Sequence, residues 1–291
     1  MKLLGIIIGI LLALALFYLF ALMGRRNEPK MELLRKYRYA HRGLHNARQG
    51  IPENSILAFR YALAGHFGVE LDVHLTRDNR LVVIHDSDLK RLCGVEGTVE
   101  EMDLAQLRQL RLQGTNERIP LLEEVLPLFE EKTPLIIEVK VVNGNHHQLC
   151  QTLCRMLESY RGDFCVESFD PRAIYWLRRN EPYFIRGQLV ENFLQQGEVA
   201  GLKLPMKLLL TSLAGNLLTR PDFIACSYAH RDILPVRICR RWLKVQEVSW
   251  TIRSKEEMAV AEADGAMVIF EHFLPDIHRK KKAAPAPETA E

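Results

Sequence analysis

Acidic residues and histidines interrupt two neighbouring apolar segments of this chain. Positions 69–86 read VELDVHLTRDNRLVVIHD, with Glu70 and Asp72 in the first half and His85 and Asp86 at the end. Side chains at positions i and i+2 of a strand point to the same side, so Glu70 and Asp72 share a face. Two buried carboxylates without a counter-charge repel each other and are costly to desolvate. The pattern therefore indicates either a cation site or an exposed surface strand.

Further polar residues stand at the ends of other strand-like segments. The segment LIIEVK carries Glu138 near its end, and Lys140 follows its last apolar residue. In a parallel barrel the carboxyl ends of the strands gather on one face, where active sites form. We therefore expect these side chains to lie together with the other polar or aromatic residues at strand ends. Those residues are His41, Arg42, Gln188 and Trp250.

Strand-like and helix-like segments alternate over about 250 residues, which is enough for one large α/β domain. The predicted strands span 37–41, 69–75, 81–85, 135–139, 164–166, 185–190, 223–226, 245–250 and 266–270. The predicted helices span 55–64, 104–110, 121–131, 147–159, 171–179, 202–218, 233–241 and 255–263. Repeated βα units favour a parallel sheet, and about eight of them predict a (β/α)8 TIM barrel rather than an open sheet.

The N-terminal segment is apolar enough to be a membrane anchor. Residues 3–23 read LLGIIIGILLALALFYLFALM, which is 21 residues without a charge. About 20 apolar residues cross a bilayer as a helix. A secretory signal would have a shorter apolar core and a small-x-small cleavage site, which residues 21–24 do not provide. Only Lys2 precedes the segment, whereas six basic residues follow by position 38, so we expect an uncleaved anchor with a cytoplasmic domain.

Composition predicts three parts in the chain. Residues 1–30 form the transmembrane anchor and its basic flank, 31–277 the barrel, and 278–291 a basic and then Ala/Pro-rich tail that we expect to be disordered. Overall, 48% of residues are hydrophobic and 26% charged, an ordinary globular balance. The net charge of +3 is too small to indicate a nucleic-acid partner, and the sequence does not reveal the oligomeric state.

Five motifs resemble those of the glycerophosphodiester phosphodiesterase family in order and spacing. They are AHRG at 40–43, PENS at 52–55, ELDVHLT at 70–76, VVIHD at 82–86 and IIEVK at 136–140. The resemblance extends over about residues 37–275. It implies a TIM barrel, one divalent cation, Mg²⁺ or Ca²⁺, and cleavage of a glycerophosphodiester to sn-glycerol 3-phosphate and an alcohol.

The resemblance also implies roles for individual residues. The metal ligands would be Glu70, Asp72 and Glu138, and the general acid and base would be His41 and His85. The phosphate-binding residues would be Arg42 and Lys140, with Asn54 as a further polar residue of the site. Gln188 and Trp250 are expected to bind substrate. The resemblance further implies that the substrate's own glycerol hydroxyl attacks phosphorus, giving a cyclic phosphate that water then opens.

Elementary chemistry agrees with this assignment. Negative charge accumulates when phosphorus becomes five-coordinate, and a hard cation with two basic side chains can stabilise it. Three carboxylates suit Mg²⁺ or Ca²⁺ rather than a soft metal. The sequence departs from the family pattern at Ser55, where Thr is commoner, and at Arg253, where Asn is common. The last strand also lacks the usual Thr-Asp ending, for which Glu271 is a candidate replacement.

Two alternatives stay open from the sequence. The same chemistry could act on a lysophospholipid or another membrane phosphodiester, as a lysophospholipase D does; the substrate would then be a lipid headgroup next to the anchoring membrane. Alternatively, the chain could be a membrane-anchored, non-catalytic binding protein. The presence of both histidines and all three carboxylates favours an enzyme over that second alternative.

Overall fold

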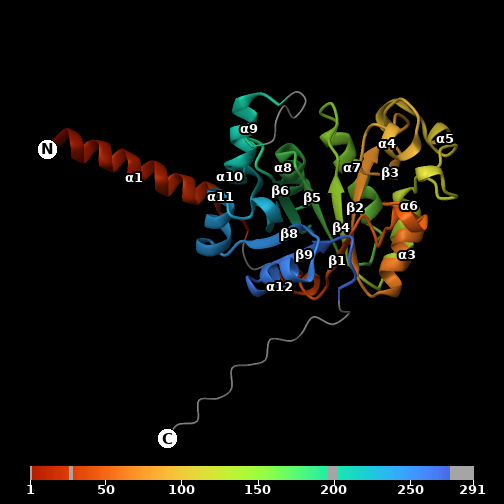
Figure 1. The fold of residues 1–291 in the computed structure, drawn as a ribbon. Helices are drawn as coiled ribbons and strands as arrows, with labels where there is room; N and C mark the ends of the chain where they lie inside the picture. The colour runs from red at the N-terminus through yellow and green to blue at the C-terminus, as the bar shows by residue number, and fades with distance from the viewer. Residues whose placement is uncertain (1, 26–28, 196–201, 276–291) are drawn as a thin grey trace, which may run out of the picture.

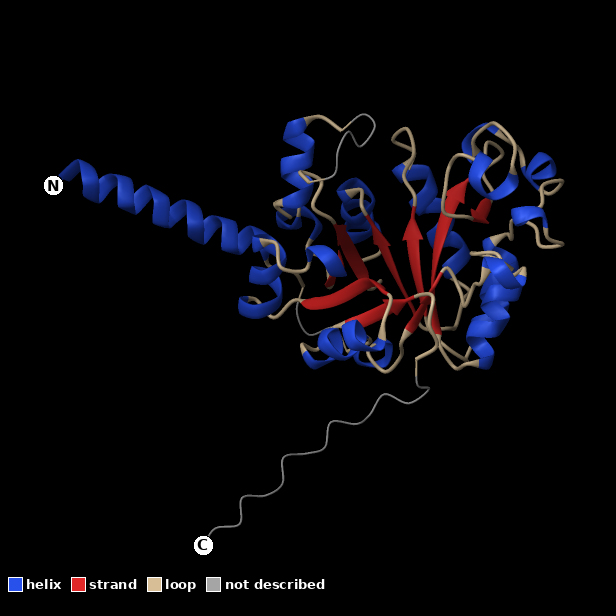
Figure 2. Ribbon diagram, in the orientation of Figure 1, coloured by secondary structure: helices blue, strands red, loops and turns tan. Residues whose placement is uncertain are grey.

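The structure is a computed structural model that describes residues 2–25, 29–195 and 202–275. Within these residues, eight parallel strands close into a barrel surrounded by helices (Figures 1 and 2). The first strand closes it, because Tyr39 pairs with Gly68 on one side and with Ile269 on the other. The predicted TIM barrel is confirmed. Its strands are β1 (Tyr39–His41), β2 (Gly68–Leu75), β4 (Leu135–Val139), β5 (Phe164–Ser168), β6 (Arg186–Val190), β7 (Phe223–Ser227), β8 (Gln246–Ile252) and β9 (Met267–Phe270).

The predicted strand at 81–85 is shorter and lies outside the parallel barrel. It forms β3 (Leu81–Val83), which pairs antiparallel with β2 through Val73 and Val83. A hairpin explains this orientation, because only five residues separate β2 from the strand-like segment and a parallel return needs a long crossover. His85 therefore lies in the segment after β3 and not on a barrel strand.

Helices cover the outside of the barrel with their apolar faces inward. In α7 (His146–Leu157) the buried residues recur at helical spacing, so both cysteines belong to the core. These residues are Leu149, Cys150, Leu153, Cys154 and Leu157. The larger helices of the barrel wall are α3 (Ile56–Ala64), α6 (Leu122–Phe129), α7 (His146–Leu157), α8 (Pro171–Asn180) and α12 (Lys255–Ala263). Short helices α4 (Lys90–Cys93) and α5 (Leu104–Leu107) follow β3 and share a small apolar core instead of forming a capping domain.

Two predicted helices are interrupted. The segment 202–218 forms α9 (Leu204–Thr211) and α10 (Asn216–Thr219), because Leu213 adopts a φ of 55°, outside the helical range. The segment 233–241 forms the short α11 (Leu234–Arg237), which continues into a π-helical turn over Ile238–Trp242.

The apolar N-terminal segment forms α1 (Lys2–Leu22), which projects from the barrel (Figure 1). In the described part of the chain it is the helix long and apolar enough to cross a membrane. Its final turn packs on the barrel, since Ala21 and Leu22 are buried and the Tyr18 hydroxyl donates to the Ser212 carbonyl at 2.7 Å. The Arg220 guanidinium also donates to the Phe20 carbonyl at 2.9 Å. The predicted tail at 278–291 lies outside the described residues.

Candidate active site

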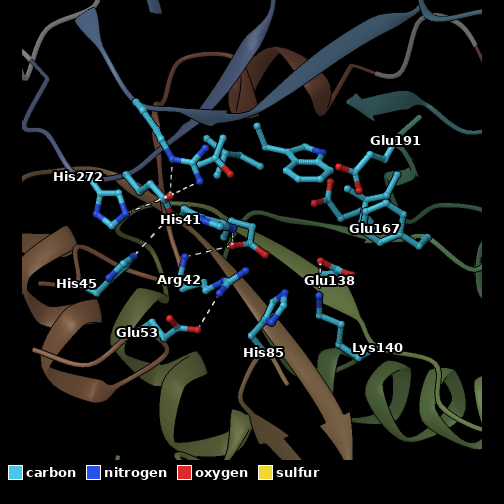
Figure 3. A pocket seen from close by; sticks show the side chains of 18 residues that line it. His41, Arg42, His45, Glu53, His85, Glu138, Lys140, Glu167, Glu191 and His272 are labelled. Carbon is cyan, nitrogen blue, oxygen red and sulfur yellow. Dashed lines mark hydrogen bonds and ion pairs between the residues drawn. The ribbon is translucent and has the colours of Figure 1, made fainter. Parts of the chain in front are cut away.

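A cavity of about 440 Å³ opens at the carboxyl ends of the barrel strands (Figure 3). Alternation along the strands explains why polar side chains reach it. Leu71 and Val73 pack outward under the helices, which turns Glu70 and Asp72 toward the barrel axis. Seven of the predicted site residues line the cavity: His41, Arg42, Glu70, His85, Glu138, Lys140 and Trp250.

Glu70, Asp72 and Glu138 form a compact group of carboxylates. Strands β2 and β4 are in register at Asp72 and Glu138, and all three residues are buried. One oxygen from each lies within 4.8 Å of those of the other two. Burial and the charges of Asp72 and Glu138 raise the pKa of Glu70 well above its ordinary value. This crowding, together with an all-oxygen donor set, fits a hard divalent cation held by the three side chains.

Lys140 connects two of these carboxylates. Its Nζ lies 2.9 Å from Asp72 Oδ1 and 2.8 Å from Glu138 Oε2. Burial alone would lower the pKa of Lys140, but the two carboxylates outweigh it and raise the pKa. The ammonium is therefore charged, and it stands at the edge of the carboxylate group, where a phosphate oxygen would also be attracted.

The loop after β1 supports the carboxylates from the other side. The backbone N–H of Arg42 donates to Glu70 Oε2 at 3.1 Å, and its guanidinium donates to Glu53 at 2.8 Å. Asn54 Nδ2 donates to Asp72 Oδ2 at 2.8 Å. Asn54 does not line the cavity, so the structure places it behind Asp72 rather than against a substrate. Ser55, and not Asn54, caps α3 by accepting a hydrogen bond from the Ala58 N–H.

His41 is backed by a carboxylate from the opposite end of the chain. Its Nδ1 lies 2.6 Å from Glu271 Oε2, which leaves Nε2 facing the carboxylate group, 3.8 Å from Glu70. Burial lowers the pKa of His41, although Glu271 opposes that effect. Burial would raise the pKa of Glu271, but His41 and Arg253 outweigh it and keep this carboxyl ionised. A neutral imidazole with a free Nε2 can act as a general base.

His85 has a similar arrangement built from local sequence. Its Nδ1 lies 2.6 Å from Oδ1 of the adjacent Asp86, which also pairs with Arg91. The buried His74 binds the His85 carbonyl through Nε2 at 3.1 Å and Glu100 through Nδ1 at 2.6 Å. His74 therefore fixes the backbone that presents His85.

Three predicted residues, Asn54, Asp72 and Gln188, do not line the cavity, and other residues do. Gln188 donates to the Ser168 and Phe169 carbonyls at 3.0 and 3.2 Å and does not line the cavity. The sequence analysis did not single out Glu167, a buried residue that pairs in register with Glu138 and lines the cavity. The sequence pattern that could have identified Glu167 is the same as for Glu138: an acidic residue within an apolar strand. Other unanticipated lining residues are His45, Glu53, Phe169, Leu189, Glu191, Thr251, Ile269 and His272.

Glu167 differs from the other carboxylates of the cavity. It is 1% exposed, and its Oε2 makes no hydrogen bond within the described part of the chain. Burial and the charge of Glu138 raise the pKa of Glu167 well above its ordinary value. Figure 3 shows it between Glu138 and Glu191 on the side of the cavity opposite His45.

A closed parallel barrel that gathers acids, histidines and the cationic side chains of Arg42 and Lys140 at the carboxyl ends of its strands is typical of a TIM-barrel enzyme with an anionic substrate. Comparison with known proteins gives the family. The sequence model of the Glycerophosphoryl diester phosphodiesterase family matches residues 41–273. The chain belongs to this family and is a phosphodiesterase, as the motifs at 40–43, 52–55, 70–76, 82–86 and 136–140 indicated.

Individual relatives agree with the family. A glycerophosphodiester phosphodiesterase from Caldanaerobacter subterraneus subsp. tengcongensis is 30% identical over 231 residues, covering 75% of this chain and 86% of the relative. A lysophospholipase D from Rattus norvegicus is 34% identical over 122 residues, 38% of each chain. The structure of a phosphodiesterase from Oleispira antarctica, bound to sn-glycerol-3-phosphate, has a TM-score of 0.66 at 21% identity and covers 83% of this chain and 94% of that one. At that identity the structural likeness concerns the fold.

Proposed function

We propose that this phosphodiesterase uses a divalent cation to hydrolyse glycerophosphodiesters to sn-glycerol 3-phosphate and an alcohol. One observation carries the proposal: the carboxylate group of Glu70, Asp72 and Glu138 shares a cavity with two histidines, each backed by an acid. The two histidines can serve as the general acid and the general base, and a cation would offset the repulsion between the three buried carboxylates. Membership of an enzyme family removes the basis for a non-catalytic binding protein.

The cation would be Mg²⁺ or Ca²⁺, held by Glu70, Asp72 and Glu138. When bound, it would supply positive charge to the phosphate oxygens. Arg42 and Lys140 would bind the same phosphate from either side of the carboxylates. Trp250 lines the cavity and would pack against the substrate, whereas Asn54 orients Asp72 through its amide.

The two histidines would divide the proton transfers. His41 Nε2 accepts the proton of the glycerol hydroxyl, whose oxygen then attacks phosphorus. His85 gives a proton to the leaving alkoxide, so the alcohol departs neutral and a cyclic phosphate remains. Water then opens the ring with the same groups acting in reverse. The 32% exposure of the His85 side chain suits the leaving-group role, because the departing alcohol must reach solvent.

A lysophospholipid is the second candidate substrate. The observation that favours it is the contact between α1 and the barrel, which places the apolar helix directly beside the catalytic domain. We further propose that α1 is an uncleaved anchor. The basic residues that follow it would keep the barrel on the cytoplasmic side.

A coupled assay for glycerol 3-phosphate tests the activity. Glycerophosphocholine, glycerophosphoethanolamine and glycerophosphoglycerol would be offered with Mg²⁺, with Ca²⁺ and with excess chelator. We expect product from at least one diester with a cation present and none in chelator. Absence of product from every diester under every condition would refute the proposed function.

A further inference from the structure

A second cavity adjoins the candidate active site and is mainly apolar. It has a volume of about 570 Å³, within the range of small-molecule sites. Glu138, Lys140 and Phe169 line both cavities, so the two cavities are neighbours at these three residues. The apolar lining comes from the segment after β4, the segment after β6 and helix α9: Val141, Val142, Phe193, Met206, Leu209 and Leu210. We call these six residues the apolar groove.

Helix α9 exposes side chains that a soluble surface rarely gathers on one short helix. Met206 is 44% exposed and Leu209 40% exposed, and both face the groove. The charged residues that line this cavity are paired: Asp170 with Arg172 at 2.6 Å, and Glu138 with Lys140 at 2.8 Å. A hollow of this kind beside a phosphodiester site fits a hydrocarbon chain better than a polar ligand.

Helix α9, which lines part of the groove, is followed directly by a residue that contacts the apolar N-terminal helix α1. Ser212, the residue that follows α9, accepts the 2.7 Å hydrogen bond from Tyr18 of α1. Leu209 and Leu210 lie within one helical turn of Ser212. Figure 1 shows α1 leaving the barrel on the side where α9 and α10 lie. A bilayer crossed by α1 would therefore lie against α9, and a lipid entering from it would meet the groove first.

We propose that the apolar groove binds the acyl chain of a monoacyl glycerophosphodiester whose phosphate occupies the candidate active site. The inference rests on the proposed function and specifies its substrate class. The free glycerol hydroxyl attacks phosphorus, the bond from phosphorus to the headgroup oxygen breaks, and the headgroup alcohol takes the proton. Water then opens the cyclic phosphate, so the products are a monoacylglycerol phosphate and the headgroup alcohol.

A series of substrates that differ only in chain length tests the groove. The full chain in detergent would be assayed for choline release from glycerophosphocholine and from hexanoyl, octanoyl and decanoyl lysophosphatidylcholine, all kept monomeric. We expect kcat/KM to rise with chain length, by up to about fourfold for each methylene that the groove buries. Glycerophosphocholine has no chain and reports the chemistry alone.

Two matched double variants locate the effect. Met206→Asp with Leu209→Asp places two charges in the groove at exposed positions, and should abolish the dependence on chain length while leaving glycerophosphocholine turnover within about twofold of the native protein. Leu204→Asp with Leu208→Asp makes the same change at exposed positions of α9 outside the groove, and should retain the dependence.

Each contrary result has a distinct meaning. Turnover of glycerophosphocholine without any effect of chain length would overturn the groove and leave the proposed function intact. Dependence that survives in the Met206/Leu209 variant, or that both double variants lose equally, would place the chain elsewhere and overturn the proposal. Equal loss on glycerophosphocholine and on the lysophospholipids would also overturn it, because the groove residues would then support catalysis in general. No turnover of any substrate would refute the proposed function itself.

Discussion

His41 Nδ1 and Glu271 Oε2 lie 2.6 Å apart, although 230 residues separate them in the chain. The pair exists because β1 lies between β2 and β9, so the first and last barrel strands end side by side. His85 obtains an equivalent carboxylate from its neighbour Asp86 at the same distance. Both histidines therefore have a carboxylate partner. The partner of His41 reaches it only when the barrel closes, whereas the partner of His85 is its neighbour in the chain.

The His41–Glu271 pair predicts a change in pH dependence. The anionic Glu271 raises the pKa of His41, so Glu271→Gln should lower that pKa further below its ordinary value. The base must be neutral, so the acidic limb of kcat/KM should move to lower pH, while the maximum falls by roughly 10²-fold as the ring loses its orientation. A pH profile at saturating cation measures both. Glu53→Gln, in the same cavity, should leave the limb in place; a limb that stays or rises in Glu271→Gln would contradict the role of Glu271.

The carboxylate group predicts a cation that stabilises the fold. Glu70→Gln, Asp72→Asn and Glu138→Gln should each weaken Mg²⁺ or Ca²⁺ binding in calorimetric titration. Excess chelator should abolish activity and lower the Tm, because a ligand that binds only the folded state stabilises it. Glu53 is paired with Arg42 and Arg91, so Glu53→Gln should bind the cation nearly as the native protein does. Full activity in chelator would exclude the cation.

The two histidines should differ from the carboxylates in what their loss affects. His41→Ala and His85→Ala should leave cation binding nearly intact and lower turnover by roughly 10²–10⁴-fold each. The double variant should lose far less than the product of the two effects, because both groups serve one transition state. A p-nitrophenyl diester needs no leaving-group proton, so it should rescue His85→Ala and not His41→Ala. Cation affinity that falls as far as in Asp72→Asn would instead make the histidines ligands.

Glu167 predicts an unusual dependence of stability on pH. Its pKa is raised, so above the ordinary range of a carboxyl the folded protein keeps a proton that the unfolded chain releases. Stability in chelator should therefore decline as pH rises above the ordinary pKa of a carboxyl, and Glu167→Gln should reduce the decline, with a gain of roughly 1–3 kcal/mol at the highest pH tested. Urea unfolding at several pH values measures it. The exposed Glu158→Gln is the control, and an unchanged slope in Glu167→Gln would contradict the prediction.

An anchored barrel predicts both the mass and the accessibility of the mature protein. As a proposed uncleaved anchor, α1 should persist in the membrane fraction, where mass spectrometry can detect its residues. Protease added to sealed, right-side-out cells should spare the barrel, and the same protease should digest it after permeabilisation. Digestion in sealed cells would reverse the orientation, and a mature chain beginning near residue 24 would identify a signal sequence.

Local sequence was sufficient for most of the barrel and for the centre of the site. Alternation put Glu70 and Asp72 on one face of their strand but left open whether that face was a cation site or an exposed surface. The family motifs, which also include Glu138, indicated the cation site. The same alternation did not distinguish a barrel strand from a hairpin partner. That is why the segment at 81–85 was predicted by its composition, whereas its antiparallel pairing came from the tertiary structure.

Contacts between distant strand ends were beyond the reach of local patterns. Glu271 was recognised as a candidate, but nothing in its surroundings showed that it would meet His41. Gln188 stood near a strand end as expected, yet its side chain turns to the Ser168 and Phe169 carbonyls. Whether an end residue faces the cavity or a neighbouring loop depends on one rotamer and on loops whose paths the sequence does not specify.

Closure of the barrel between β1 and β9 joins the two ends of the domain, with Tyr39 opposite Ile269. Contacts between residues so far apart in the chain are entropically costly and are expected to form late in folding. The strands that carry Glu70, Asp72 and Glu138 are nearer one another in the chain and could assemble earlier. A refolding barrel would then acquire its cation-binding group before its base, so recovery of enzymatic turnover would report the final event of folding, while recovery of cation binding would report an intermediate.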